Sequence, residues 1–201
     1  MGIINMDLII YLHGFRSTAE GNKSQLLRKM FPRVKVIALD YSPHDPELAT
    51  QQLSKIITEN DDDEIVVIGT SLGGFWARWA ASRFFVKSIL INPALHPDRS
   101  LKVGSYENYH DPSLKIIVTE KALAQFCDYK VSANSQTYAR VLLAMDDDII
   151  DAFATKAELD DLHNVICFDH GGMRAGHEFR SPYLNSNLIS LFRKPTSNSA
   201  L

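Results

Sequence analysis

The feature that most constrains the fold of this chain is the alternation of short aliphatic runs with longer helix-like segments. The runs are rich in Val and Ile, and nearly every position within them is apolar. Strands buried on both faces of a parallel sheet have this composition, whereas half-exposed strands alternate apolar and polar residues. The runs are LIIYLH (8–13), VKVIAL (34–39), EIVVIG (64–69), KSILIN (87–92), RVLLAM (140–145) and NVICFD (164–169).

Segments with helical character lie between these predicted strands. They span about 20–31, 45–59, 73–85 and 151–162, and another, about 182–193, closes the chain. This repeated strand–helix–strand order predicts an α/β fold: a mostly parallel, doubly wound sheet of about six strands with helices on both faces. With 201 residues, 45% of them hydrophobic, the whole chain (1–201) is expected to form a single domain with one core.

One connection, residues 93–137, is too long for a simple crossover between the fourth and fifth predicted strands. Long insertions of this kind are usually functional loops or lids, so we expect a lid-like insertion here. Within it, the segment SLKIIVTEKALAQF (113–126) is compatible with either a short strand or a helix.

Charge and cysteine content argue against several classes of partner. The formal net charge of −3 gives no reason to expect nucleic acid or an anionic membrane as a partner. No stretch approaches the roughly 20 apolar residues of a membrane span, and the N-terminus lacks the basic region of a secretory signal. Cys127 and Cys167 match no metal-ligand spacing and no disulfide framework, which favours a reducing compartment.

A serine between two glycines follows the third predicted strand, in GTSLG (69–73). A strand before this pattern and helically spaced apolar residues after it are the context of a nucleophile elbow. In an elbow the serine occupies a strained turn, and small neighbours let strand and helix approach closely. The Leu72 N–H then lies at a helix N-terminus, where it can stabilise an oxyanion. Ser71 is the candidate nucleophile, and a merely structural small-residue turn is the alternative.

A second oxyanion donor is expected from the loop that ends the first predicted strand, HGF (13–15). This loop should lie beside Ser71 at the carboxyl edge of the sheet, where open α/β folds bind ligands. The backbone N–H of Phe15 is the natural donor. The side chain of His13 is expected only to hydrogen-bond the loop, and Gly14 to permit a tight turn.

A serine hydroxyl becomes an effective nucleophile when a base takes its proton. Two histidines, His170 and His177, lie beyond the last predicted strand in FDHGGMRAGHEF (168–179). His170 follows the strand almost directly and has little freedom to reach Ser71. His177 follows a glycine-bearing loop, so it is the predicted base, with His170 as the second choice. The remaining histidines away from the first strand have ordinary surface positions: His44, His96, His110 and His163.

A serine and its histidine base usually act together with a carboxylic acid that orients the imidazole, in a catalytic triad. In this fold the acid lies between the serine and the histidine in the sequence, and MDDDIID (145–151) supplies candidates. Asp146 belongs to the strand end, Asp148 is expected to N-cap the following helix, and Asp151 is expected inside it. Asp147, at the turn itself, is best placed to accept a hydrogen bond from the imidazole. A metal site formed by the same aspartates is the alternative, but they lack the spacing of a calcium loop, so no metal is expected.

Taken together, these motifs resemble the α/β-hydrolase superfamily, and more closely the small YqiA/YcfP-type bacterial serine esterases. The resemblance is carried, in the same order along the chain, by IIYLHGFRSTAEGNKSQLL (9–27), GTSLGGFWARW (69–79), INPALHP (91–97), MDDDIID (145–151) and GHEF (176–179). It implies a minimal α/β-hydrolase fold in which the two leading strands of the larger superfamily are absent.

The resemblance also implies a cytoplasmic serine esterase or thioesterase without cofactors. The nucleophile, acid and base would be Ser71, Asp147 and His177, and the N–H groups of Phe15 and Leu72 would form the oxyanion hole. The predicted reaction is hydrolysis of small carboxylic esters or thioesters through a covalent acyl-enzyme. An acyl-CoA thioesterase, a non-catalytic binding protein that retains the fold, and a lyase or haloperoxidase on the same scaffold are the alternatives.

Substrate size can be inferred from the insertion. Its half DRSLKVGSYENYHD (98–111) is too polar to line a long acyl tunnel, and a long acyl chain needs a long apolar wall to be bound with preference. We therefore expect a shallow acyl pocket that favours short acyl groups, with Phe15 and Phe75 as its apolar walls.

Overall fold

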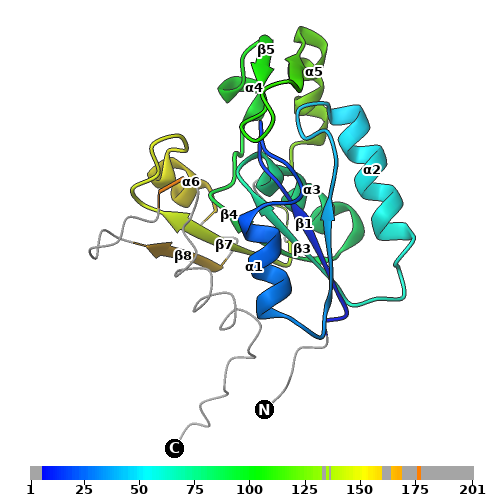
Figure 1. The fold of residues 1–201 in the computed structure, drawn as a ribbon. Coiled ribbons are helices and arrows are strands. Elements are labelled where there is room, and N and C mark those ends of the chain that lie inside the picture. The colour runs from blue at the N-terminus through cyan, green and yellow to red at the C-terminus, as the bar shows by residue number, and fades with distance from the viewer. Residues whose placement is uncertain (1–5, 133–134, 136, 160–163, 169–175, 178–201) are drawn as a thin grey trace, which may run out of the picture.

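The computed structural model describes residues 6–132, 135, 137–159, 164–168 and 176–177 (Figure 1). Its centre is a six-stranded sheet in which every neighbouring pair of strands is parallel. In spatial order the strands are β2 (Lys35–Leu39), β1 (Leu8–Leu12), β3 (Ile65–Thr70), β4 (Lys87–Ile91), β7 (Ala139–Ala144) and β8 (Asn164–Phe168). Each predicted strand is confirmed, with ends shifted by one residue at most.

The helices predicted between the strands are confirmed as well. They are α1 (Asn22–Met30), α2 (Pro46–Thr58), α3 (Leu72–Phe84) and α6 (Ala152–Leu159). The predicted helix at 182–193 lies outside the described residues.

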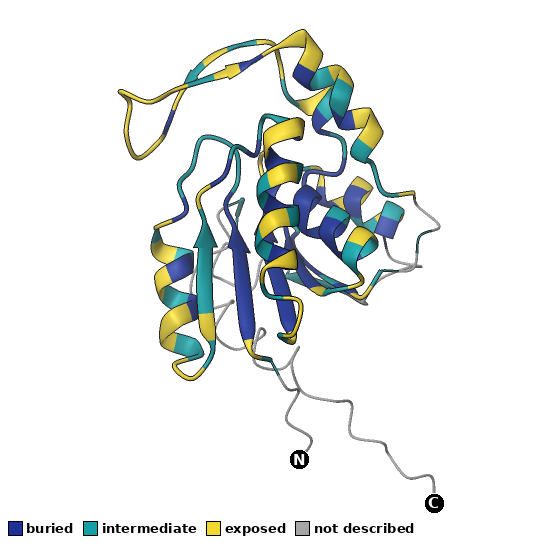
Figure 2. Ribbon diagram, turned by 90° about the vertical axis from the view of Figure 1, so that its right-hand side faces the viewer, coloured by how far each residue is buried: buried dark blue, intermediate teal, exposed yellow. Residues whose placement is uncertain are grey.

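The two faces of the sheet are covered by different helices, and alternate residues of β1 pack against each face. Leu8, Ile10 and Leu12 belong to the hydrophobic cluster that contains the buried residues of α2 and α3. Ile9 and Tyr11 belong to the opposite cluster, which contains Leu27 of α1. Because both faces are covered, all residues of β1 are buried (Figure 2), and a continuous apolar run is favoured over an alternating one.

The insertion between β4 and β7 contains its own small elements. They are α4 (Pro97–Ser100), β5 (Gly104–Glu107), β6 (Lys115–Val118), α5 (Glu120–Gln125) and the 3-10 helix η1 (Phe126–Tyr129). Strands β5 and β6 form a separate antiparallel hairpin. The segment 113–126 therefore holds a strand and then a helix. Figure 2 shows the hairpin beyond the carboxyl ends of the central strands.

In the part of the chain that the structure describes, no helix combines the length and the apolar character needed to cross a membrane.

Candidate active site

Ser71 occupies the turn between β3 and α3 in a backbone conformation that residues other than glycine rarely adopt. Its φ is 54° and its ψ is −120°, and a non-glycine residue there is strained. Hydrogen bonds from the neighbouring segment hold the turn. The Ser71 N–H donates to the Ile91 carbonyl at 2.9 Å, and the Ser71 carbonyl accepts from the N–H of Ala94 at 3.0 Å and of Gly74 at 2.8 Å.

The glycines on either side of Ser71 make this turn possible. A Cβ added to Gly69 would overlap the carbonyl of Gly73, and a Cβ added to Gly73 would overlap the carbonyl of Leu12 at the end of β1. Backbone atoms cannot move aside as the tip of a flexible side chain can. The close approach of strand and helix inferred from the sequence is therefore present, and it also extends to β1.

The loop after β1 passes directly beside the Ser71 side chain. A Cβ built on Gly14 would lie 3.2 Å from the Ser71 Cβ and 3.7 Å from its Oγ. This contact lies between β1 and β3, where the strand order reverses because β2 is on the other side of β1. Ligands of open α/β sheets bind at the carboxyl ends of the strands at such a switch point.

The two N–H groups predicted to form an oxyanion hole, those of Phe15 and Leu72, follow these two contacting residues. Phe15 comes directly after Gly14, and Leu72 is the first residue of α3. Neither N–H donates a hydrogen bond to another described residue. Helix N-termini leave such donors free for a ligand. The Leu72 N–H is thus free of other described partners next to Ser71, and the Phe15 N–H follows the glycine that contacts Ser71. The role of both groups as oxyanion donors stays a prediction.

The side chain of His13 hydrogen-bonds the loop after β1, as the sequence led us to expect. Its side chain is buried, its Nδ1–H donates to the Gly14 carbonyl at 2.9 Å, and the Tyr41 hydroxyl donates to the His13 carbonyl at 2.9 Å. Burial lowers the pKa of His13 below its ordinary value, which favours the neutral ring.

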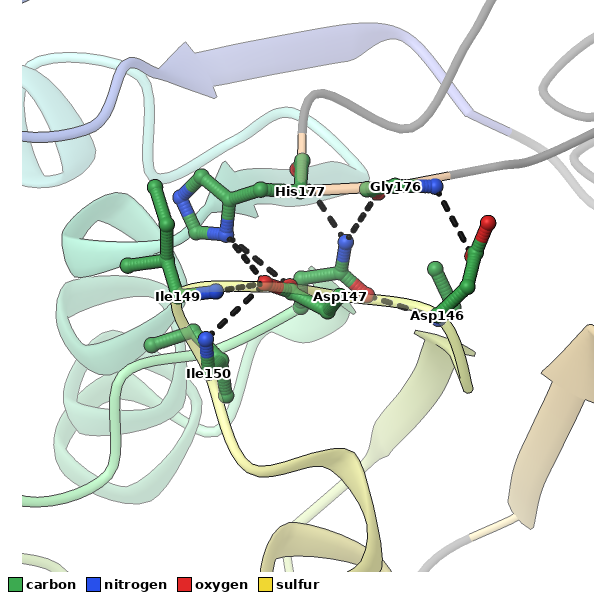
Figure 3. Close-up of polar contacts among 8 residues, drawn as sticks. Asp146, Asp147, Ile149, Ile150, Gly176 and His177 are labelled. Atoms are coloured by element: carbon green, nitrogen blue, oxygen red, sulfur yellow. Dashed lines mark hydrogen bonds and ion pairs between the residues drawn. The ribbon is translucent and has the colours of Figure 1, made fainter.

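Asp147 and His177 form a carboxylate–imidazole pair at the carboxyl end of β7 (Figure 3). The His177 Nδ1 lies 2.9 Å from Oδ2 and 3.1 Å from Oδ1 of Asp147. The same Oδ1 accepts the N–H groups of Ile149 and Ile150, each at 2.8 Å. The Asp147 side chain is only 1% exposed. These donors fix the carboxylate in one orientation, and the imidazole with it.

This pairing determines which nitrogen of His177 can act as a base. With Nδ1–H donating to the carboxylate, Nε2 carries the lone pair. Figure 3 shows Nε2 on the edge of the ring that faces away from Asp147. The His177 side chain is 19% exposed.

The structure separates the aspartates of the segment that follows β7. Asp151, not Asp148, is the N-cap of α6: its Oδ1 accepts the Ala154 N–H at 2.9 Å. The expectations that Asp148 caps the helix and that Asp151 lies inside it are wrong. Asp147 closes a turn by accepting the N–H groups of Ile149 and Ile150, so α6 begins at Ala152 and not directly after Asp148.

Two residues that sequence analysis did not connect to the base contact the loop that carries it. The Asp146 Oδ1 accepts the Gly176 N–H at 2.9 Å, and the side chain of Asn92 reaches the backbone at Gly176 and His177. Asn92 was the last residue of the predicted strand 87–92, and nothing in the sequence indicated its contacts. His170, the second choice for the base, lies outside the described residues.

The two phenylalanines predicted as acyl-pocket walls lie in different environments. Phe75 is in the core, with its ring edge-on to Trp76 and to Phe126 at centroid distances of 4.9 and 5.5 Å. Phe15 is half-buried, with its ring edge-on to Tyr106 of β5 at 5.1 Å. Contact with an acyl group stays a prediction for both, and the aromatic neighbour of Phe15 comes from the insertion.

Hydrogen bonds hold the hairpin of the insertion against the loop after β1. The Arg16 Nε donates to the Glu107 carbonyl at 2.8 Å, and the Tyr109 N–H donates to the Arg16 carbonyl at 2.8 Å. The Asn108 Nδ2 donates to the Ser17 carbonyl at 3.0 Å. The insertion therefore packs next to the segment that carries Phe15.

A metal ion has no evident place among the residues whose positions the structure gives: no group of three or more His, Cys, Asp or Glu side chains is arranged to hold one.

Comparison with known families and sequences gives a consistent match. The sequence profile described as "Uncharacterised protein family (UPF0227)" matches residues 8–181. A UPF0227 protein of Vibrio parahaemolyticus is 31% identical over 165 residues, which cover 79% of this chain and 86% of the relative.

Comparison with solved structures identifies the fold. Mouse alpha/beta hydrolase domain-containing protein 10 matches with a TM-score of 0.65 and 19% identity, covering 91% of this chain and 86% of the other. A monoacylglycerol lipase of Paleococcus ferrophilus matches with a TM-score of 0.69 and 14% identity, covering 95% and 97%. At these identities the likeness shows the fold alone. The predicted α/β-hydrolase fold is confirmed.

Proposed function

This chain belongs to the UPF0227 family, and from the side chains at the carboxyl edge of its sheet we propose that it is a serine hydrolase acting on small carboxylic esters or thioesters. The observation that carries the proposal is the positive-φ turn at Ser71 on the sheet edge that also holds the Asp147–His177 pair. Such a conformation costs about 1–3 kcal/mol and is found mainly where function requires it.

In the proposed first step, the His177 Nε2 takes the proton of the Ser71 hydroxyl while Oγ attacks the substrate carbonyl carbon. Asp147 holds the imidazole in the required tautomer and stabilises its charged form. The carbonyl oxygen becomes negatively charged, and the N–H groups of Phe15 and Leu72 would donate to it. The alcohol or thiol then leaves with the proton from His177, and the acyl group stays on Ser71.

In the proposed second step, His177 takes a proton from water, whose oxygen attacks the acyl-enzyme carbonyl. The same N–H groups receive the oxyanion, and the Ser71 oxygen leaves with the proton. The products are a carboxylic acid and the free enzyme. We propose a cytoplasmic location for this reaction, as the resemblance to the small bacterial serine esterases implies.

A fluorophosphonate probe tests this proposal directly, because it reacts covalently with activated serines. The wild-type protein should be labelled at Ser71 and should hydrolyse p-nitrophenyl esters. The Ser71→Ala variant should keep its thermal unfolding transition, remain unlabelled and lose about 100-fold or more of kcat/KM. A panel of acyl esters and acyl-CoAs then separates esterase from thioesterase.

Two outcomes would contradict the proposal. A wild-type protein inert toward the probe and toward every activated ester would favour a binding protein that retains the fold. Full activity in purified Ser71→Ala would favour a lyase or haloperoxidase, whose chemistry does not use the serine.

A further inference from the structure

Asn92 stands directly after β4, with its side chain completely buried and its backbone in the left-handed region at φ 43°. A buried side-chain amide must be hydrogen-bonded, because leaving its groups unpaired is costly. We propose that Asn92 is a positioning residue for the general base: its amide fixes the backbone on which His177 stands. The inference rests on the proposed function, in which His177 takes the proton from the nucleophile.

The contacts of Asn92 use every polar atom of its side chain. The Nδ2 group donates to the Gly176 carbonyl at 3.0 Å and to the His177 carbonyl at 3.1 Å. Its Oδ1 accepts the Ala144 N–H at 2.8 Å. Only one orientation of the amide satisfies two acceptors and one donor, so the oxygen faces β7 and the nitrogen faces the histidine.

The backbone of Asn92 anchors this amide to the sheet. The Asn92 N–H donates to the Leu142 carbonyl of β7 at 2.9 Å, and the side chain then takes the N–H of Ala144 two residues further along. The side chain thereby continues the ladder between β4 and β7 beyond the last strand residue. A group held at both ends of this short span has little freedom to move.

The same segment also holds the nucleophile. The residue before Asn92, Ile91, accepts the Ser71 N–H, and Ala94 donates to the Ser71 carbonyl. Residues 91–94 therefore contact the backbone of the candidate nucleophile and, through the amide of Asn92, the backbone of the candidate base. Proton transfer depends on the placement of the imidazole relative to the hydroxyl, and small misplacements are costly.

Asn92 is not the only residue that holds Gly176 and His177, because two aspartates after β7 bond them as well. The Gly176 N–H donates to Asp146 at 2.9 Å, and the His177 ring is bonded to Asp147. These bonds hold the loop from the β7 side. The Asn92 amide connects the same loop to β4, which contacts Ser71. Loss of Asn92 should therefore shift the imidazole relative to Ser71 while its bond to Asp147 is retained or weakened.

Two substitutions separate the side chain of Asn92 from its backbone. Glycine tolerates positive φ, so Asn92→Gly keeps the turn and removes all three side-chain hydrogen bonds. Asp is close in shape and also tolerates the left-handed region, so Asn92→Asp keeps the acceptor for the Ala144 N–H. It replaces the donor group with an oxygen that faces the carbonyls of Gly176 and His177, which is repulsive.

Kinetics with a p-nitrophenyl ester are the main readout. Both variants should lower kcat by about tenfold to a hundredfold, as expected for a misplaced catalytic group, and should change KM by less than about threefold. Fluorophosphonate labelling should slow by a similar factor. Asn60→Gly, at the end of α2 with a side-chain bond to the Ile56 carbonyl, is the matched control and should keep wild-type kinetics.

A spectroscopic readout distinguishes positioning from a general loss of structure. The Nδ1–H of His177 should give a low-field proton resonance in the wild-type protein that is absent in His177→Ala. In Asn92→Gly this resonance should shift or broaden while the circular dichroism spectrum stays native. In the wild-type protein itself, the two Nδ2 protons of Asn92 should exchange slowly with solvent, a test that needs no variant to fold.

Opposite results would overturn the proposal. They are wild-type kcat within about twofold in folded Asn92→Gly and Asn92→Asp, an unchanged Nδ1–H resonance, or rapid exchange of the Asn92 amide protons. Failure of the proposed function looks different: the wild-type protein would then be inert toward esters and probe, while the resonance and exchange measurements would still report whether Asn92 positions His177.

Discussion

The two halves of the candidate site are held in place by different physical means. Ser71 is fixed by its backbone, in a turn that exists only because Gly69 and Gly73 lack side chains. His177 is fixed by side chains: Asn92, directly after β4, and Asp147, in the turn after β7, bond it directly. The backbone contacts at Gly69 and Gly73 leave no room for an added side chain, whereas each hydrogen bond to His177 can be removed separately. Substitutions of the glycines around Ser71 should therefore affect folding, and substitutions on the histidine side should mainly affect turnover.

The largest expected effect on the histidine side is the loss of the base or of its acid. His177→Ala should be nearly inactive and Asp147→Asn should lose roughly 10²- to 10⁴-fold of kcat, because an amide cannot hold the tautomer or stabilise the imidazolium. Denaturation midpoints and kcat/KM for a p-nitrophenyl ester are the measurements. Asp148→Asn is the matched control, since its exposed side chain neighbours the same turn, and it should keep near wild-type activity.

A reversed order of these aspartate variants would contradict the assignment of the acid. His170→Ala should retain most activity; if it were the inactive variant and His177→Ala were active, the base would have been assigned to the wrong histidine.

On the serine side, a single added methyl group should break the fold locally. Gly73→Ala would place a Cβ against the carbonyl of Leu12, and we expect a loss of about 1–3 kcal/mol or more in the free energy of unfolding. Urea denaturation measures it. Gly21→Ala is the control, because a Cβ there meets nothing within 4 Å and its φ of −165° suits any residue; it should cost less than about 1 kcal/mol. Equal stabilities would show that the elbow is not sterically constrained.

This contrast also explains what the sequence could and could not predict. The strands could be predicted because burial on both faces of the sheet requires apolar runs, as in β1 and β3. The elbow could be predicted because close backbone contact requires glycines around Ser71. The contacts of Asn92 join segments that are 84 residues apart in the sequence, and an asparagine after a strand gives no sign of what it bonds. The N-cap of α6 was misplaced for a related reason, because Asp147 uses its oxygen in a turn that delays the helix.

A third region, the hairpin of the insertion, should have a smaller effect that concerns substrate choice. The ring of Tyr106 packs edge-on against Phe15 beside the candidate oxyanion loop. We expect kcat/KM to be highest for short p-nitrophenyl esters, and Tyr106→Ala to raise the relative rate with longer acyl chains a few-fold by opening this side of the site. Ile117→Ala is the control, since Ile117 is 63% exposed on the same hairpin.

The ester series can also refute this picture. A steady rise of kcat/KM from acetyl to palmitoyl in the wild-type protein would show that the insertion folds over the site as an apolar lid. The long-chain thioesterase would then be the better proposal.

The smallest expected effect is a pH dependence of stability that originates on the serine side. Burial lowers the pKa of His13 below its ordinary value near 6.5, and it lowers the pKa of His44 in the same direction. Below pH 6.5 the unfolded chain therefore binds protons that the folded chain excludes. The free energy of unfolding should fall as the pH drops from about 6.5 through the folded pKa values, by at most about 1.4 kcal/mol per pH unit for His13. The contribution of the more exposed His44 should be smaller because solvent screens it.

Removing one imidazole tests the source of this slope. Because His13→Gln keeps a side-chain donor near the Gly14 carbonyl and removes the titrating ring, the variant should lose less stability than the wild-type protein between pH 7 and pH 5. Urea denaturation at half-unit steps of pH measures both slopes. The wild-type slope has contributions from both histidines, so His44→Gln should reduce it as well. If neither variant changes the slope, the rings are protonated as easily in the folded protein as in the unfolded chain. The buried packing of His13 beside the elbow would then be looser than its contacts with Gly14 and Tyr41 indicate.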